Sequence, residues 1–252
     1  LKAAHAIGAG WLARAERLLE QEGECPERAG FQLRLSRDLM ERGMLEFALE
    51  SARRCEETAR RHGDRQTEVL GVHQEGQLLV RLGEMDAGMR LIDEGTAAAL
   101  GGELSLFWTA IVFCWTISIC RDFADYERGS KLTDATAGWC ARNSVTGFPG
   151  ICRVHQAELL RLRGALGRAE EEALAAADEL TGHALGWKGA ALREVGDIRL
   201  RTGNLAGAEA AYRQAAELGV DPEPGRSLLE LARNRADSAA SSLLRALAGE
   251  GD

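Results

Sequence analysis

Histidines are the side chains of this sequence that most readily support acid–base chemistry, and they are scattered along the chain (His5, His62, His73, His155 and His183). No GxSxG or comparable nucleophile motif accompanies them. His155 stands beside Arg153 and Glu158 in a helical pattern, where a hydrogen bond to a neighbour accounts for it without catalysis. An acid–base pair of Glu158 and Glu194 would require both carboxylates to converge in space. We therefore expect no catalytic residues and no enzyme activity, with an enzyme built around a small-molecule pocket as an alternative.

A metal site is the second chemistry to weigh. Cys140, Cys152 and His155 could meet across the loop RNSVTGFPG, but their spacing fits no common zinc pattern, and a structural zinc ion normally takes four ligands. The six cysteines contain no CxxC pair, and several fall in apolar helical patterns, where a free thiol behaves as a small hydrophobe. We therefore expect buried thiols, no metal, no cofactor and a reducing, cytoplasmic location.

The stretch LSLFWTAIVFCWTISIC, from Leu104 to Cys120, is the most informative candidate for a binding site. Its seventeen residues carry no formal charge. Trp108 and Trp115 are seven residues apart and share one side of a helix. A stripe of small, weakly polar residues lies beside them within about 60° of the helix circumference: Ser105, Thr109, Val112 and Thr116. The stripe predicts either a face that lines a ligand or peptide, or a covered core helix whose hydroxyls bond to backbone carbonyls.

The same stretch raises the question of a membrane span. It is one residue shorter than the usual threshold, contains Ser and Thr, and is bounded by Glu103 and Arg121. We therefore expect burial inside a helical array and no membrane partner.

The amino-acid composition indicates the class of fold that positions these residues. Alanine, leucine, glutamate and arginine dominate, and the chain has only four prolines, which favours an all-α protein. The net charge of −8 argues against a nucleic-acid-binding surface, which needs an excess of Lys and Arg.

An internal repeat with a period near forty residues organises the chain. One column of small residues runs through Ser36, Gly76, Ile117, Ala157 and Gly196. A second column runs through Ala48, Gly88, Gly129, Ala169 and Ala208. Both keep intervals of 39 to 41, and Ile117 is the one large residue among the ten. We expect Ile117 to widen its helix pair locally and to open a pocket beside Trp115.

The repeat predicts a single α-helical domain over residues 1–252, an α-solenoid of stacked helix hairpins. A leading helix at about 3–20 precedes five core pairs within about 30–218. The expected pairs are 30–42 with 46–61, 65–82 with 85–99, 104–121 with 125–142, 150–163 with 166–180, and 184–201 with 205–218. A trailing pair occupies about 225–247, at 225–235 and 238–247. The chain starts without Met and within a helical pattern, so we expect a fragment of a longer protein.

The segment LREVGDIRLRTGNLAGAEAAYRQAAELG (192–219) resembles a tetratricopeptide repeat. Gly196, Gly203, Ala208 and Tyr212 carry the likeness, whereas Arg199 stands where that family has an aromatic residue. The resemblance implies that first helices line a concave groove. The arginines of these first helices, Arg153, Arg161, Arg193 and Arg199, would then suit an acidic peptide.

Three longer segments resemble the repeat region of large bacterial LuxR-type transcriptional regulators and of related ATPase- or cyclase-linked signalling proteins. They are GMRLIDEGTAAALGGEL (88–104), PGICRVHQAELLRLRG (149–164) and the segment from Gly196 to Arg235. The resemblance implies a sensor or docking arm. The GxxxxGK[ST] phosphate loop is missing from the sequence, so we do not expect nucleotide hydrolysis.

We expect a non-catalytic scaffold that binds a protein, a peptide or a small effector in its groove, as part of transcription regulation or signalling. The expected groove residues are Trp108, Thr109, Trp115, Thr116, His155 and Arg199. No direct nucleic-acid binding is expected. The alternative is an assembly scaffold that self-associates through the ends of the solenoid, for example as a homodimer.

Overall fold

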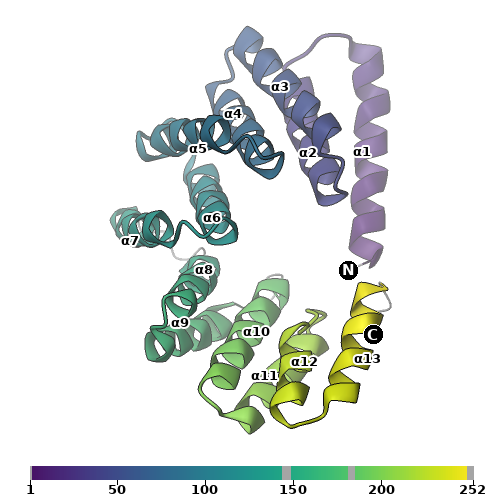
Figure 1. Ribbon diagram of the computed structural model, residues 1–252. Helices are drawn as coiled ribbons and strands as arrows, with labels where there is room; N and C mark the ends of the chain where they lie inside the picture. Colours follow the sequence, from purple (N-terminus) through teal and green to yellow (C-terminus); the bar gives the residue numbers. More distant parts are fainter. Residues whose placement is uncertain (1, 144–148, 181–184, 249–252) are drawn as a thin grey trace. The chain divides into compact units, whose positions relative to one another are not determined.

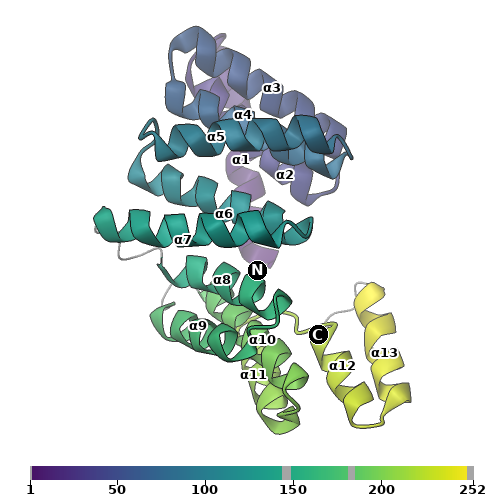
Figure 2. The ribbon, with the colours of Figure 1, turned by 60° about the vertical axis from the view of Figure 1, so that its left-hand side comes forward.

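The computed structural model describes residues 2–143, 149–180 and 185–248 and contains only helices over these ranges (Figures 1 and 2). The prediction of an all-α fold is confirmed. The chain divides into two compact units, residues 1–119 and 120–252, and the division falls near the end of one helix.

The first unit consists of a long leading helix followed by helix pairs. Its helices are α1 (Lys2–Glu22), α2 (Glu27–Glu41), α3 (Leu45–His62), α4 (Arg65–Arg81), α5 (Met85–Leu100) and α6 (Leu106–Asp122), whose last residues belong to the second unit. Consecutive helices pack against each other from α1 to α5, and α2 also packs against α4. Since α2 and α4 are the first helices of successive pairs, the first helices form a layer of their own.

The second unit repeats the same arrangement. Its helices are α7 (Tyr126–Arg142), α8 (Pro149–Leu162), α9 (Leu166–Glu179), α10 (Leu185–Arg201), α11 (Leu205–Glu217), α12 (Gly225–Ala232) and α13 (Ala236–Leu247). Consecutive helices pack together from α7 to α13, and α10 also packs against α8 and α12. Two bounds differ most from the expected ranges: α2 starts at Glu27, before residue 30, and α12 ends at Ala232, before residue 235. Residue 184, the expected start of α10, lies outside the described residues.

Glycines in the left-handed conformation end the first helices of several pairs. Gly43, Gly83, Gly164 and Gly203 have φ angles of +75°, +95°, +82° and +80°. L-residues with a Cβ rarely adopt this conformation, so these positions favour glycine. The second helices then begin at once, and the Asn204 side chain accepts a hydrogen bond from the Gly207 amide to cap α11.

The two columns of small residues mark the places where the helices of a pair come closest. A Cβ on Gly76 would stand 2.7 Å from the Gly88 carbonyl oxygen, and a Cβ on Gly88 would stand 2.6 Å from the Gly76 carbonyl oxygen. One pair earlier, the Ser36 hydroxyl donates to the Ala48 carbonyl at 2.8 Å. Only small residues allow this approach of two backbones, which explains why small residues occupy these columns.

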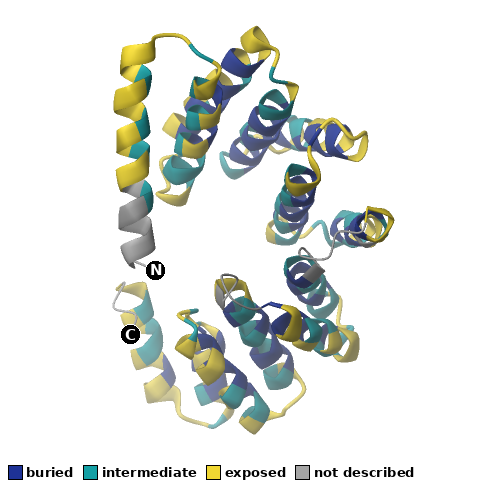
Figure 3. Ribbon diagram, turned by 180° about the vertical axis from the view of Figure 1, so that it is seen from behind, coloured by how far each residue is buried: buried dark blue, intermediate teal, exposed yellow. Residues whose placement is uncertain are grey.

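The stretch without charges forms α6 and is buried along most of its length (Figure 3). Val112, Phe113 and Ile117 are fully buried, so packing against protein accounts for the missing charges. None of the helices in the described residues combines the length and apolar character needed to cross a bilayer. The packing of Ile117 against α7 would span the boundary between the two units, so the expected local widening stays a prediction.

Candidate functional site

A partly exposed row of aromatic rings on α6 meets an arginine of α2. The ring centroids of Phe107 and Trp108 are 5.3 Å apart, and those of Trp108 and Trp115 are 6.3 Å apart. The guanidinium carbon of Arg37 lies 3.9 Å from the Trp115 ring centroid, a close cation–π contact. We call these four residues (Arg37, Phe107, Trp108 and Trp115) the Arg37–Trp115 surface.

The charge of Arg37 has no carboxylate partner among the described side chains. Its Nη1 donates to the Gln74 amide oxygen at 3.2 Å, which leaves the guanidinium with a neutral acceptor and an aromatic face. Burial is the main cause that lowers the Arg37 pKa to about 10, and the nearby Arg34 and Arg81 add to this effect against Glu41. The side chain therefore remains charged at neutral pH in an environment that favours an anion.

A buried, uncharged hydrogen-bond network supports the surface from below. The His73 Nε2 and Thr116 Oγ1 atoms are 2.9 Å apart, and Thr116 Oγ1 is also 2.9 Å from Thr96 Oγ1. On the other side of the ring, the Gln77 amide nitrogen lies 3.2 Å from His73 Nδ1. The network joins α4, α5 and α6, and it fixes the helices that carry Arg37's neighbours.

The geometry assigns the state of His73. Because an amide nitrogen can only donate, Nδ1 accepts from Gln77, and the ring proton lies on Nε2 and is donated to Thr116. Complete burial, together with the charge of Arg37, lowers the His73 pKa to about 3. The imidazole is therefore neutral at physiological pH, and its centroid lies 5.9 Å from that of the Trp115 ring.

The residues expected to form the groove on α6 divide into two groups. Trp108 and Trp115 are partly exposed and belong to the surface. Thr109 and Thr116 are buried, and their hydroxyls bond to the carbonyls of Leu104 at 3.5 Å and Val112 at 2.9 Å. The two threonines thus support the tryptophans from the interior.

The other two expected groove residues, His155 and Arg199, belong to the second unit. His155 is buried, and its Nδ1 lies 3.1 Å from a Glu158 carboxylate oxygen. The His155 and Trp187 ring centroids are 5.3 Å apart in a T-shaped arrangement. Arg199 forms an ion pair with Glu170 at 2.7 Å. Both side chains are therefore held by neighbours within their own unit.

The interior of the second unit carries ions. Arg121 forms an ion pair with the buried carboxylate of Glu158. Burial opposes the ionisation of Glu158, but the hydrogen bond from His155 and the charge of Arg121 outweigh it and lower the pKa to about 2. Arg161 forms an ion pair with the buried Glu194, whose pKa burial nevertheless raises to about 7, with help from Glu158.

The two glutamates considered as an acid–base pair therefore lie in one electrostatic network with pKa values shifted in opposite directions. Such a split is common in active sites, but structural ion-pair networks produce it too. Each carboxylate is bound by a guanidinium, and Arg153 and Arg199 are likewise paired with glutamates. The arginines expected to line a groove are thus mostly neutralised inside the unit.

Cys140, Cys152 and His155, weighed above as zinc ligands and not expected to bind metal, belong to no metal-binding group over the part of the chain that the structure describes. No group of three or more His, Cys, Asp or Glu side chains is placed there to hold an ion. None of the six cysteines, all of which lie in the described ranges, forms a disulfide bond. Burial raises the pKa of the Cys140 thiol, and the nearby Cys152 contributes to this shift, which keeps it protonated and a poor metal ligand.

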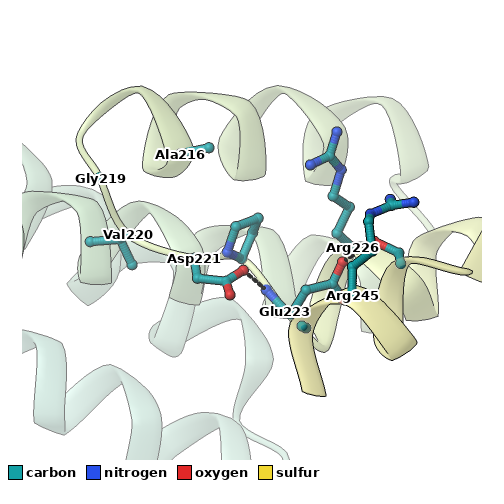
Figure 4. A pocket seen from close by; sticks show the side chains of 10 residues that line it. Ala216, Gly219, Val220, Asp221, Glu223, Arg226 and Arg245 are labelled. Atoms are coloured by element: carbon teal, nitrogen blue, oxygen red, sulfur yellow. Dashed lines mark hydrogen bonds between the residues drawn. The ribbon is translucent and has the colours of Figure 1, made fainter. Parts of the chain in front are cut away.

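The linker between α11 and α12 forms a wall of two pockets. Figure 4 shows the first, of about 200 Å³, where Arg226 and Arg245 extend along the rim and the Glu223 amide donates to Asp221 at 2.9 Å. The second, of about 360 Å³, lies against α10 and includes Arg161, Arg193 and Arg201. Pro222 and Glu223 line both pockets.

The fold and the close contacts between paired helices are those of a tetratricopeptide-like helical-repeat protein. Two solved structures are similar to the chain. One is a tetratricopeptide repeat protein from Parabacteroides merdae, with a TM-score of 0.64, 15% sequence identity and coverage of 98% of this chain and 90% of that one. The other, from Podosopora anserina, is described as a putative kinesin light chain with nearly identical TPR-like repeats, with a TM-score of 0.59, 13% identity and coverage of 78% and 97%.

No family profile matches the sequence, and no curated protein sequence matches it significantly. At these identities, the two structures establish the fold of the chain and leave its function open.

The sequence interpretation missed Arg37, His73 and Gln74. A signal for Arg37 was present in the repeat: the residue after each member of the first small-residue column is polar. These residues are Arg37, Gln77, Ser118, Glu158 and Asp197. The small residues of a first helix pack against its paired helix. The polar position that follows each of them lies about 100° further around the helix, and it marks the same face on every first helix.

Proposed function

We propose that this chain is a non-catalytic scaffold that binds a protein partner on the Arg37–Trp115 surface. The observation that carries the proposal is the Arg37 guanidinium, stacked on Trp115 and without a carboxylate partner among the described residues. A partner with an acidic group beside an apolar one would form an ion pair with Arg37 and would cover the partly exposed aromatic rings of Phe107, Trp108 and Trp115. Arginine and tryptophan are the residues most enriched among those that dominate protein–protein binding energies.

The position of the surface supports this proposal. Arg37, Gln74 and Trp115 come from α2, α4 and α6, the first helices of three consecutive pairs. The neutral network beneath them is fully satisfied, so the surface is rigid before the partner arrives, and less conformational entropy is lost on binding. The resemblance to LuxR-type regulators supports a role as the sensor or docking arm of a longer, cytoplasmic signalling or transcription-regulating protein.

A pair of phenylalanines offers a sharp test. Phe107 belongs to the surface and Phe47 of α3 does not, yet both side chains are 60% exposed. A photo-crosslinking phenylalanine analogue is introduced at either position in cells that express the protein. We expect a discrete crosslinked protein from position 107 that position 47 does not give, and we expect Arg37→Ala to abolish it. Identical products from both positions, or none from position 107, would contradict the proposal.

Self-association is a second candidate, and a separate observation favours it. The first and last helices expose large apolar side chains, Trp11 and Leu18 on α1 and Leu244 and Leu247 on α13. Such residues would be covered if copies of the chain met at these helices. Light scattering over a concentration series tests this directly, because a strict monomer excludes it.

A further inference from the structure

The pocket of about 360 Å³ between α10 and the α11–α12 linker combines cationic and apolar walls. Arg193 and Arg201 of α10 contribute guanidinium groups, and Leu228 of α12 contributes a side chain that is 50% exposed. Pro224 and Leu200 extend the apolar part. Its volume is within the usual range for small-molecule sites.

The carboxylates at this pocket are already engaged. Asp197 accepts a hydrogen bond from the Tyr212 hydroxyl at 2.8 Å. Glu223 accepts from the Ser242 hydroxyl at 2.7 Å and from the Ser227 amide at 3.1 Å. Neither Arg193 nor Arg201 forms an ion pair with any described carboxylate, whereas Arg161 at the pocket edge is paired with Glu194. Asp197 and Glu223 keep their negative charges, but their oxygens are held by these neutral donors, and the guanidinium groups of Arg193 and Arg201 remain without an ion pair among the described residues.

Arg193 carries an additional signal. Its Nε atom is buried and has no hydrogen-bond partner among the described residues. A buried donor without an acceptor is destabilising, and such groups are rare in folded proteins. A small rotation of the guanidinium toward an acceptor in the pocket would satisfy this N–H group, since Arg193 already lines the pocket.

We propose that this pocket binds a small organic anion, whose oxyanion head is held by Arg193 and Arg201 and whose apolar part lies against Leu228 and Pro224. A guanidinium group binds carboxylate and phosphate oxygens through paired N–H donors, so both heads share the required chemistry. The site belongs to the second unit and is independent of the Arg37–Trp115 surface.

Two aromatic probes distinguish the two heads. Benzoate and phenyl phosphate are titrated into the full chain by calorimetry, with sodium chloride at equal ionic strength as the reference. We expect saturable binding of at least one probe below about 10 mM and a rise in the melting temperature of roughly 1–5 °C at saturation. Binding of benzoate alone identifies a carboxylate ligand, and binding of phenyl phosphate alone identifies a phosphate ester.

Three variants locate the binding. Arg193→Gln removes the charge, and Leu228→Glu places a negative charge at an exposed rim position that tolerates substitution. Each is expected to weaken binding at least tenfold, roughly the loss of one charged hydrogen bond. Arg168→Gln removes an exposed arginine of α9 outside the pocket and should leave the affinity unchanged. The proposal is overturned if neither probe binds saturably, or if Arg193→Gln and Leu228→Glu bind as tightly as the unmodified protein.

Discussion

The two units bury different kinds of polar side chain between their first helices. The first unit uses neutral groups: the His73 imidazole bonds to the Thr116 hydroxyl at 2.9 Å through one ring nitrogen and to the Gln77 amide at 3.2 Å through the other. The second unit uses ions, with Glu158 and Glu194 each bound by an arginine. One repeat architecture therefore accepts either solution, as long as each buried polar group finds a partner.

The difference has a consequence for recognition. In the second unit Arg121, Arg161 and Arg199 are paired with glutamates, and the cations left for a ligand include Arg193 and Arg201 at the pocket beside the α11–α12 linker. In the first unit no carboxylate enters the network, so the charge of Arg37 remains available above it. The neutral interior of the first unit thus leaves Arg37 directly above it without an ion pair among the described residues, whereas the ionic interior of the second unit pairs Arg121 and Arg161 with its glutamates. Four experiments test this comparison.

Removal of one member of the ionic network should have the largest effect. Glu158→Ala leaves Arg121 without its buried partner and His155 without an acceptor at Nδ1. We expect the free energy of unfolding to fall by about 3–5 kcal/mol, as for other broken buried ion pairs. Denaturant unfolding monitored by circular dichroism measures this loss. A change smaller than about 1 kcal/mol would show that solvent replaces the pairing, and the contrast between the units would disappear.

The pH dependence of the two units should have opposite signs. The folded-state pKa of His73 is about 3 instead of 6.5, so the unfolded chain binds the extra proton and the first unit loses stability as pH falls below 6.5. The folded-state pKa of Glu194 is about 7 instead of 4.5, so its contribution to the second unit falls as pH rises from 4.5 to 7. Each slope is roughly 1 kcal/mol per pH unit.

Hydrogen exchange resolves these slopes, because amides of α4 report on the first unit and amides of α10 on the second. Between about pH 5 and pH 6.5, protection should increase with pH in α4 and decrease in α10. Glu194→Gln should remove the slope in α10 and leave α4 unchanged. Slopes of the same sign in both helices would refute the assignment of the charged states.

A smaller effect is expected from the shared hydroxyl of the neutral network. Thr116→Val keeps the shape of the side chain but leaves the His73 N–H and Thr96 without this partner. The hydroxyl of the similarly buried Thr136 bonds, among the described residues, to the Leu132 carbonyl alone. We expect Thr116→Val to cost about 1–3 kcal/mol and Thr136→Val about 1 kcal/mol or less. Thermal unfolding measures both, and equal costs would mean that His73 finds another acceptor.

The smallest effects on stability belong to the binding surface. Phe107→Ala and Phe47→Ala remove equally exposed rings, so each should change the free energy of unfolding by about 0.5 kcal/mol or less. Trp108→Ala should strongly reduce the yield of the crosslinked product from position 107, while the melting temperature changes little. If the melting temperature collapses and the remaining folded protein still crosslinks, Trp108 is a core residue.

The sequence predicts the parts of the fold that rest on local rules. The small-residue columns locate Gly76 and Gly88, where two helices touch, and the seven-residue spacing places Trp108 and Trp115 on one side of α6. Gly203, one of the residues that carry the tetratricopeptide likeness, follows the end of α10 with a positive φ angle. Each of these signals is repeated or lies within one helix, and can therefore be read from spacing alone.

The site depends on contacts that spacing does not encode. Arg37 and Trp115 are 78 positions apart in the sequence, and nothing local indicates that a guanidinium on one helix will cover an indole on another. The burial of Thr109 and Thr116 has a similar cause, since the neighbours of α6 decide which part of its stripe faces solvent. The rotation of each helix about its axis is set by packing, and this rotation separates ligand-facing from supporting residues.

The linker shared by the two pockets of the second unit has a thermodynamic consequence. Pro222 and Glu223 face the Arg226 side as well as the Arg193 side. A ligand that displaces Pro222 and Glu223 in one pocket changes the volume of the other pocket. The coupling free energy between two such ligands is the same whichever binds first. If a ligand in one pocket changes the affinity of the other pocket by some factor, the second ligand changes the affinity of the first pocket by the same factor. A few linker residues would therefore couple two binding equilibria.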